Sequence, residues 1–300
     1  MLCITHSIVT SGLLLLDKPS GPTSHDLVYV VRRGTGEKRV GHAGTLDPLA
    51  SGLLIVCLGS AVRLSESLLG KPKCYRARVR WGQTTNTYDA QGQIMSENPA
   101  LPARPAVEAA LARFRGPILQ RPPAFSAVKR AGHKAYEFAR RGEELELAPR
   151  PVEITALAIT DWQPPECELE VTCSAGTYIR SLAHDLGQAL GCGAHIAGLR
   201  RTASGAFTVE QAVPLDQLRA EFAAGQWLQR LRPAEAAVAD LPPVTLSAEA
   251  ARRIQHGQAI PREIPARDLA RAYNPAGEFI ALLRADPQAP LWRPHKVFKE

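Results

Sequence analysis

Residues 41–52 read Gly41-His42-Ala43-Gly44-Thr45-Leu46-Asp47-Pro48-Leu49-Ala50-Ser51-Gly52, and this stretch places a single acid, Asp47, among small and apolar residues. Proline disfavours the helical region for the residue before it, so an extended or turn conformation is expected at Asp47. The glycines permit tight turns and the close approach of another backbone. Because the apolar run over 53–58 predicts a buried strand, the stretch indicates a carboxylate displayed on a constrained loop that leads into the core. The alternative is a turn in which Asp47 only caps neighbouring backbone amides.

The segment before this loop has the pattern of a strand, a turn and a helix. Residues 13–16 are four leucines, and the turn residues of 17–22 follow them. Thr23 or Ser24 can cap a helix that runs to about residue 33. Along the chain, the Asp47 loop therefore follows a predicted strand and helix and precedes the predicted strand over 53–58.

The clearest strand of the chain is Cys74–Trp81. One of its faces carries Tyr75 and apolar residues, and the other carries three arginines at alternate positions. The arginine face is either a solvated charged surface or a functional one. Tyr75 lies near the start of the strand, where an amphipathic ring suits the mouth of a cleft.

The rest of the chain has the pattern of a large unit followed by a small one. The later predicted elements are helices over 61–69, 105–115, 132–141, 181–190, 214–231 and 247–256, and strands over 152–160, 168–174, 279–283 and 296–298. Residues 197–205 have the composition of a turn-rich stretch, and 240–243 that of a linker. These patterns predict a domain over 1–240 and a small β-rich module over 241–300.

The charge balance favours a polyanionic partner. The chain has 36 Lys and Arg against 29 Asp and Glu, and 28 of the 36 are arginines, whose planar fork of donors suits phosphate and stacks on bases. The densest basic stretch lies over 121–141, a reasonable surface for contacts with a nucleic-acid backbone. The alternative is a solvated helix face on an ordinary basic protein.

The cysteines and the N-terminus favour a reducing compartment. The six cysteines form no CxxC pair, so neither a zinc site nor a disulfide framework is indicated. The leucine run over 13–16 is too short for a signal peptide or a bilayer span. A soluble cytoplasmic protein without a membrane segment is therefore expected.

Several catalytic signatures are missing from the sequence, including a Walker loop, a complete GxGxxG and a GxSxG elbow. An enzyme built on Asp47 is therefore expected to work without a metal or an organic cofactor. A carboxylate can act as nucleophile or base when a cation fixes its orientation, and Arg180 is the candidate cation. A tyrosine can stack on an extruded base. A non-catalytic RNA-binding protein and a small-molecule glycosyl-transferring enzyme remain open as alternatives.

Five motifs, in order along residues 12–210, resemble those of the TruB family of tRNA pseudouridine synthases. They are Leu16-Asp17-Lys18-Pro19, the Asp47 stretch, Lys73-Cys74-Tyr75, Gly176-Thr177-Tyr178-Ile179-Arg180-Ser181-Leu182 and Leu199-Arg200-Arg201-Thr202. The C-terminal part is similar to a PUA-like RNA-binding module through 274–279 and 294–298. The resemblance implies an α+β fold, with a mixed, largely antiparallel sheet around a central catalytic cleft and a small C-terminal β module.

The resemblance also implies a function and residue roles. The substrate would be the uridine at position 55 in the T loop of tRNA, converted to pseudouridine without a cofactor by a monomeric enzyme that binds the T-stem-loop. Asp47 would be the nucleophile and Arg180 its partner, while Tyr75 would stack on the uracil and take part in removing the C5 proton. The substrate pocket would be completed by His42, Tyr178, Leu199 and Lys18.

Overall fold

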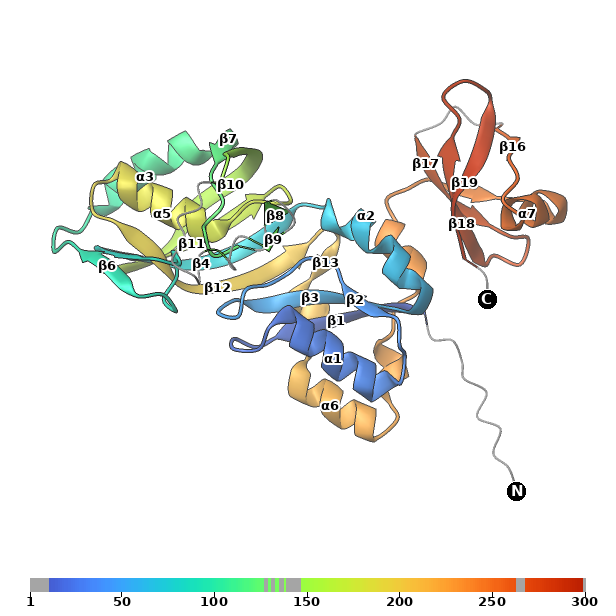
Figure 1. Cartoon of the computed structure of the whole chain (residues 1–300), viewed down its shortest axis with the longest axis horizontal. Helices are drawn as coiled ribbons and strands as arrows, with labels where there is room; N and C mark the ends of the chain where they lie inside the picture. Colours follow the sequence, from blue (N-terminus) through green and yellow to red (C-terminus); the bar gives the residue numbers. More distant parts are fainter. Residues whose placement is uncertain are drawn as a thin grey trace.

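The computed structural model describes residues 11–126, 129–130, 133–134, 138, 147–262 and 268–298. Its main feature is a ten-stranded sheet with the order β14-β1-β3-β12-β4-β11-β10-β7, in which β13 pairs with β12 and β2 with β3 (Figure 1). The strands are β1 Gly12–Lys18, β2 Val40–His42, β3 Ser51–Leu58, β4 Lys73–Trp81, β7 Gly116–Gln120, β10 Arg150–Gln163, β11 Glu166–Cys173, β12 Ala194–Ser204, β13 Phe207–Thr208 and β14 Val213–Pro214. Only the β1–β14 and β3–β12 pairs among these strands are parallel, so the predicted mixed, largely antiparallel α+β fold is confirmed.

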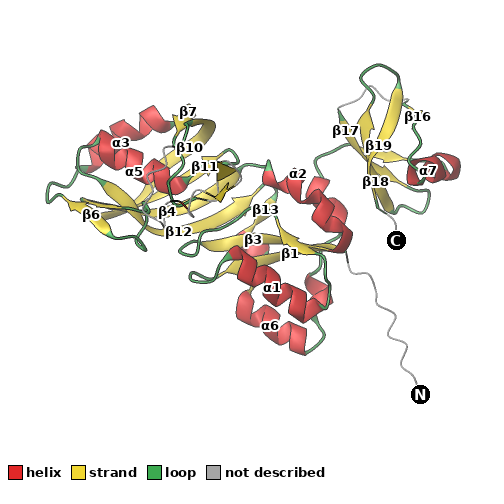
Figure 2. Cartoon of the chain, viewed as in Figure 1, coloured by secondary structure: helices red, strands yellow, loops and turns green. Residues whose placement is uncertain are grey.

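Helices pack on the two halves of this sheet as separate layers (Figure 2). The helices are α1 Ser24–Thr35, α2 Ser65–Leu69, α3 Arg104–Leu111, α5 Ile179–Ala189 and α6 Leu215–Ala223, with a 3-10 helix, η1 Gly59–Leu64, leading into α2. One core cluster joins β1 and β3 to α1 and α6, and another joins β4, β10, β11 and β12 to α3 and α5. Tyr75 and Leu199 pack against both clusters, so they mark the line between the two halves.

The opposite face of β1 and β3 is also buried. Because side chains alternate across a strand, Leu14 and Leu16 face α1, whereas Leu13 and Leu15 belong to a third cluster with η1 and α2. This cluster includes Leu282 and Phe298 from the C-terminal part of the chain. The β1–β3 half is therefore the inner layer of the molecule, with apolar cover on both faces.

The C-terminal residues form a second sheet, at one end of the molecule (Figure 1). Its order is β15-β17-β18-β19-β16, with β15 Pro243–Thr245, β16 Ile260–Pro261, β17 Leu269–Tyr273, β18 Phe279–Ala285 and β19 Leu291–Val297. Helix α7, Ala248–Gln255, begins at the cap Ser247 and packs on this sheet. The second sheet has a core cluster of its own, built from residues 244–297.

Short elements complete the described chain. They are the pair β5 Gln83–Thr85 and β6 Ile94–Glu97, the pair β8 Lys129–Arg130 and β9 His133–Lys134, and the 3-10 helices η2 Ala112–Phe114, η3 Val209–Gln211, η4 Trp227–Arg230 and η5 Ala234–Val238. No helix in the described ranges is long and apolar enough to cross a membrane.

Most predicted elements are present, and four need correction. Residues 197–205, predicted as turns, belong mainly to β12, because pairing with β3 and β4 on both sides overrides their local composition. The predicted helix over 214–231 is broken at Gly225 (φ 71°), and that over 61–69 starts as the 3-10 helix η1. The predicted basic helix over 132–141 lies mostly outside the described residues, and its described part includes strand β9.

The arginine face of β4 is a charge ladder. In the antiparallel register, Arg76, Arg78 and Arg80 stand directly opposite Glu170, Glu168 and Glu166 of β11. Arg78 Nε and Arg80 Nη1 lie 3.2 and 3.6 Å from the Glu166 carboxylate. Opposite charges in direct cross-strand pairs stabilise a sheet, so the glutamates of β11 give this row of arginines a structural role.

Candidate active site

The Asp47 loop is fixed by the start of helix α1. The Ser24 hydroxyl donates to the Leu46 carbonyl at 3.1 Å and accepts from the Leu46 amide at 2.8 Å. On the other side of Asp47, the Gly21 amide donates to the Pro48 carbonyl at 2.8 Å. The residues on both sides of Asp47 are therefore bonded to the segment before or within α1, and the carboxylate is held at a defined place.

Lys18 supports the same loop through hydrogen bonds to its backbone. Its side chain is fully buried, and Nζ donates to the carbonyls of Ala50, Pro19 and Pro48 at 2.6, 3.0 and 3.3 Å. Burial lowers the pKa of this ammonium to about 8, with Asp47 opposing the shift. Lys18 does not line the cavity that contains Asp47, so it braces the loop from behind.

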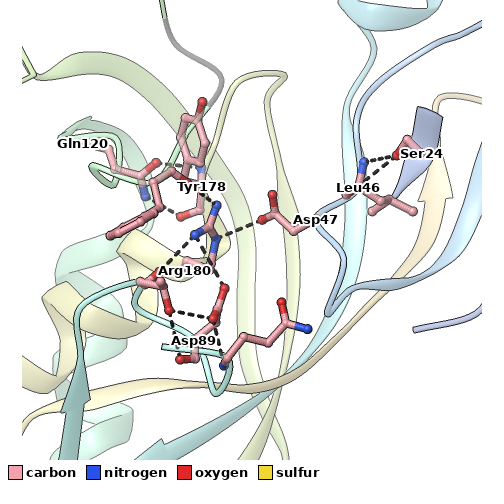
Figure 3. A network of polar contacts seen from close by, with 10 residues as sticks. Ser24, Leu46, Asp47, Asp89, Gln120, Tyr178 and Arg180 are labelled. Carbon is pink, nitrogen blue, oxygen red and sulfur yellow. Dashed lines mark hydrogen bonds and ion pairs between the residues drawn. The ribbon is translucent and has the colours of Figure 1, made fainter. Parts of the chain in front are cut away.

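Arg180 approaches Asp47 from the other half of the sheet (Figure 3). Its Nε lies 2.9 Å from Asp47 Oδ2, and its side chain is 6% exposed against 38% for Asp47. Nη1 donates to the Thr87 carbonyl at 2.9 Å and lies 3.5 Å from Asp89 Oδ2, while Nη2 donates to the Phe125 carbonyl at 3.1 Å. Both terminal nitrogens thus donate to backbone carbonyls, which fixes Arg180, while Nε has only the ion-pair contact with Asp47 and no hydrogen bond among the described residues. Asp47 keeps one side open.

Tyr178 is the residue just before α5, and a side chain outside the helix holds it. The Gln120 amide group accepts from the Tyr178 amide at 2.8 Å and donates to its carbonyl at 3.0 Å. The first bond satisfies a backbone amide at the helix start, which has no intrahelical partner. The second adds a donor to a carbonyl that already accepts from the Leu182 amide at 3.1 Å. Figure 3 shows Gln120 and Tyr178 next to Arg180, on the side of the site opposite the Asp47 loop.

Tyr75 and Arg201 stand next to each other on paired strands. They are register partners in the β4–β12 pair. Arg201 is 1% exposed; its Nε donates to the Leu53 carbonyl at 2.7 Å, and Nη2 donates to the Gly44 carbonyl of the Asp47 loop at 3.1 Å. Burial raises the pKa of the Tyr75 phenol, and the charge and hydrogen bond of Arg201 oppose that rise. The phenol is therefore protonated at neutral pH and sits beside a fixed cation.

These groups share one cavity of about 260 Å³ between the two halves of the sheet. The side chains that matter to its chemistry are Asp47, Tyr75, Tyr178, Arg180, Leu199 and Arg201. The cavity combines one half-exposed carboxylate, two aromatic rings and buried cations. It suits a planar uncharged ring, with the carboxylate as the nucleophile or base.

The structure brings five of the seven predicted site residues into this cavity. Lys18 lies behind the loop, and His42 lies on β2 outside the cavity lining. Burial and the charge of Arg201 lower the pKa of His42, and its Nδ1 is buried without a partner among the described residues. His42 is therefore a neutral imidazole close to the loop, and its predicted role in the substrate pocket stays a prediction.

Sequence reasoning assigned no role to Asp89, Gln120 or Arg201. Asp89 lies in a polar stretch that has the composition of a turn, and Gln120 ends an unremarkable strand. Their roles become visible only in the structure, where they contact site residues that are distant in sequence. Among the described residues, no group of three or more His, Cys, Asp or Glu side chains is placed to hold a metal ion.

Three family models match consecutive parts of the chain. The model for the N-terminal domain of TruB family pseudouridylate synthases matches residues 32–179. The model for the tRNA pseudouridylate synthase B C-terminal domain matches 180–239, and that for the C-terminal part of tRNA pseudouridine synthase II matches 241–299.

Named relatives and solved structures match over most of the chain. The tRNA pseudouridine synthase B of Cupriavidus metallidurans is 44% identical and covers 96% of this chain and 94% of that protein. The enzyme of the same name from Burkholderia lata is 48% identical and covers 83% of this chain and 77% of that protein. A chain of a Cbf5-Nop10-Gar1 complex is 30% identical, with a TM-score of 0.74 over 96% of this chain and 85% of that chain. This chain belongs to the TruB family of pseudouridine synthases, which are isomerases.

Proposed function

We propose that this chain converts the uridine at position 55 in the T loop of tRNA to pseudouridine, with Asp47 as the nucleophile and without a cofactor. The observation that carries the proposal is the 2.9 Å ion pair between Arg180 and the half-exposed Asp47, in a cavity that Tyr75 and Tyr178 share. The relatives' name, tRNA pseudouridine synthase B, supports tRNA as the substrate.

The reaction needs a reactive carboxylate and room for the uracil to turn. Asp47 attacks the ribose C1′ or the uracil ring, or first drives loss of a proton from the sugar; these routes stay open. In each route the N1–C1′ bond breaks, the uracil turns and a C5–C1′ bond forms. The C5 proton then leaves and N1 takes up a proton. Atoms balance within the nucleoside, so no oxidant or reductant is required. Base extrusion from a loop costs a few kcal/mol at most.

The other side chains have supporting roles in this proposal. Tyr75 stacks on the uracil and takes part in removing the C5 proton, with Arg201 beside its phenol. Tyr178 and Leu199 line the uridine pocket, and Lys18 braces the Asp47 loop. His42 fills the place that the extruded nucleotide leaves in the T loop.

We also propose that the chain acts as a monomer in the cytoplasm, and that a PUA-like module over 241–300 adds RNA contacts to a catalytic domain over 1–240. The separate core of the second sheet supports this division. Where the module meets η1, Lys296 of the module bonds to Glu66 and Arg63 of η1 bonds to the Val297 carbonyl, so the RNA contacts lie elsewhere on the module.

The test is to incubate the purified protein with an unmodified tRNA transcript and to map pseudouridine at single-nucleotide resolution. Asp47→Asn should bind the transcript nearly as well as the wild type and form no pseudouridine, because the amide keeps the shape but not the nucleophile. Asp216→Asn, whose side chain is 93% exposed, is the matched control. Normal turnover by Asp47→Asn would refute the catalytic role, and turnover of free uridine would favour a small-molecule enzyme.

A further inference from the structure

Tyr88 has an unusual backbone. Among the described residues other than glycine, it alone has a positive φ, at 62°. A bulky residue in the left-handed region is strained, and such strain persists only where the surroundings hold it. Tyr88 lies in the 86–93 loop between β5 and β6, which the cavity lining does not include.

The residues on both sides of Tyr88, Thr87 and Asp89, contact the same nitrogen of Arg180. The Thr87 carbonyl accepts from Arg180 Nη1 at 2.9 Å, and Asp89 Oδ2 lies 3.5 Å from the same atom. The turn at Tyr88 brings the residues on both of its sides to this guanidinium. On its other side the loop is tied to β12, because the Ile196 amide donates to the Tyr88 carbonyl and the Ala90 amide to the Ile196 carbonyl.

The Tyr88 ring supplies a second contact with helix α5. It stacks on the His184 imidazole with the ring centroids 3.8 Å apart and the planes 11° from parallel. His184 follows Arg180 by four residues, so the two side chains lie one turn apart on one helix face. Burial lowers the pKa of His184, so the stack joins two neutral rings. The 86–93 loop therefore contacts two successive turns of α5, at Arg180 and at His184.

We propose that Tyr88 and His184 are a positioning pair, whose stack holds the 86–93 loop against α5 and so keeps the Arg180 guanidinium aimed at Asp47. The proposal rests on the proposed function, since Asp47 and Arg180 are the reacting pair. A competing role, a stacking platform for an RNA base, would affect substrate binding and leave the turnover step unchanged.

Four variants separate the ring contact from the backbone strain. Tyr88→Gly keeps the positive φ without strain but removes the ring, and His184→Ala removes the other ring. Tyr88→Phe and His184→Phe keep an aromatic face at each position. A misplacement of 1 Å can cost about 100-fold in rate, and we expect kcat to fall about tenfold in the first two variants. KM and the Kd for tRNA should stay near wild type, and both Phe variants should retain kcat. Tyr29→Ala, an exposed aromatic on α1, is the control.

A second measurement does not depend on activity. Amide hydrogen exchange at Ala90 and Gln91, whose amides bond to Ile196 and Asp89, should accelerate in His184→Ala and Tyr88→Gly but not in His184→Phe. Unchanged exchange and kcat in the ring-deleting variants would overturn the positioning pair. A raised KM with unchanged kcat would identify an RNA-stacking surface instead. A wild-type protein that forms no pseudouridine would reject the proposed function, while the exchange data would still decide whether the stack holds the loop.

Discussion

At the scale of single residues, Lys18 is a buried charged group that holds the Asp47 loop in position. Three carbonyls around the loop accept from its Nζ, and the side chain is fully buried. Lys18→Met fills similar space but removes these donors, and an unpaired buried acceptor costs about 1–3 kcal/mol. We therefore expect a lower free energy of unfolding at pH 7 and lower activity, measured by urea unfolding and by the transcript assay. Lys38→Met, at an exposed position, should change neither.

The same residue has a defined pH dependence. Burial lowers the pKa of folded Lys18 from 10.5 to about 8. Between these values the unfolded chain binds a proton at Lys18 that the folded chain does not, so stability rises with pH through this contribution. The destabilisation measured for Lys18→Met relative to wild type should therefore grow from pH 8 to pH 10. A difference that shrinks over this range would show that the folded ammonium is stabilised instead.

At the scale of elements, Gly52 controls the contact between β3 and β12. Its φ is 98°, and a Cβ there would lie 2.3 Å from the Arg201 carbonyl oxygen and 2.8 Å from the Arg201 nitrogen. Gly52→Ala must push apart the two strands that carry the Asp47 loop and Arg201. We expect a loss of about 3 kcal/mol or more in the free energy of unfolding, by urea denaturation, together with loss of activity.

A control isolates the steric part of that effect. Gly36 also has a positive φ, 72°, but a Cβ there meets no atom within 4 Å. Gly36→Ala should cost only about 1–2 kcal/mol, the price of the left-handed conformation. Equal losses in the two variants would mean that backbone conformation, and not the contact with β12, sets the requirement for glycine at 52.

Strand β12 also shows how far local pattern could predict this protein. The strands at 53–58 and 74–81 follow from apolar runs and alternation, and the Asp47 loop from Pro48 and its glycines. Residues 197–205 have a turn-like composition because Gly198, Gly205 and two arginines dominate them. Pairing with the two neighbouring strands β3 and β4 keeps them extended, despite two register shifts. Asp89 and Gln120 escaped prediction for a related reason, since each acts on a residue far along the chain. Long-range pairing decides such positions, and local composition does not report it.

At the scale of the whole molecule, the two sheets meet through apolar contacts around Phe298. This ring is 8% exposed, lies 5.0 Å from the Phe279 ring and packs in the cluster of β1, β3 and η1. Arg63 lies over the Phe298 ring at 5.4 Å and donates to the Val297 carbonyl at 2.6 Å. The ion pairs at the junction, Lys71–Asp240 and Lys296–Glu66, involve exposed partners. Such pairs contribute about 0–1 kcal/mol, so the apolar contact should dominate the coupling.

Removal of that contact should therefore uncouple the unfolding of the two sheets. Replacing a buried Phe by Ala leaves a cavity and lowers the free energy of unfolding by about 3–5 kcal/mol. Phe298→Ala should weaken the contact between the two sheets more than the second sheet itself, because that sheet has its own core. Calorimetry should show one transition for the wild type and two for Phe298→Ala, the smaller at lower temperature. Leu228→Ala, at a half-exposed apolar position on η4, should retain one transition. A single transition in Phe298→Ala, shifted as a whole, would mean that the polar contacts of Arg63 and Lys296 couple the two sheets without the ring.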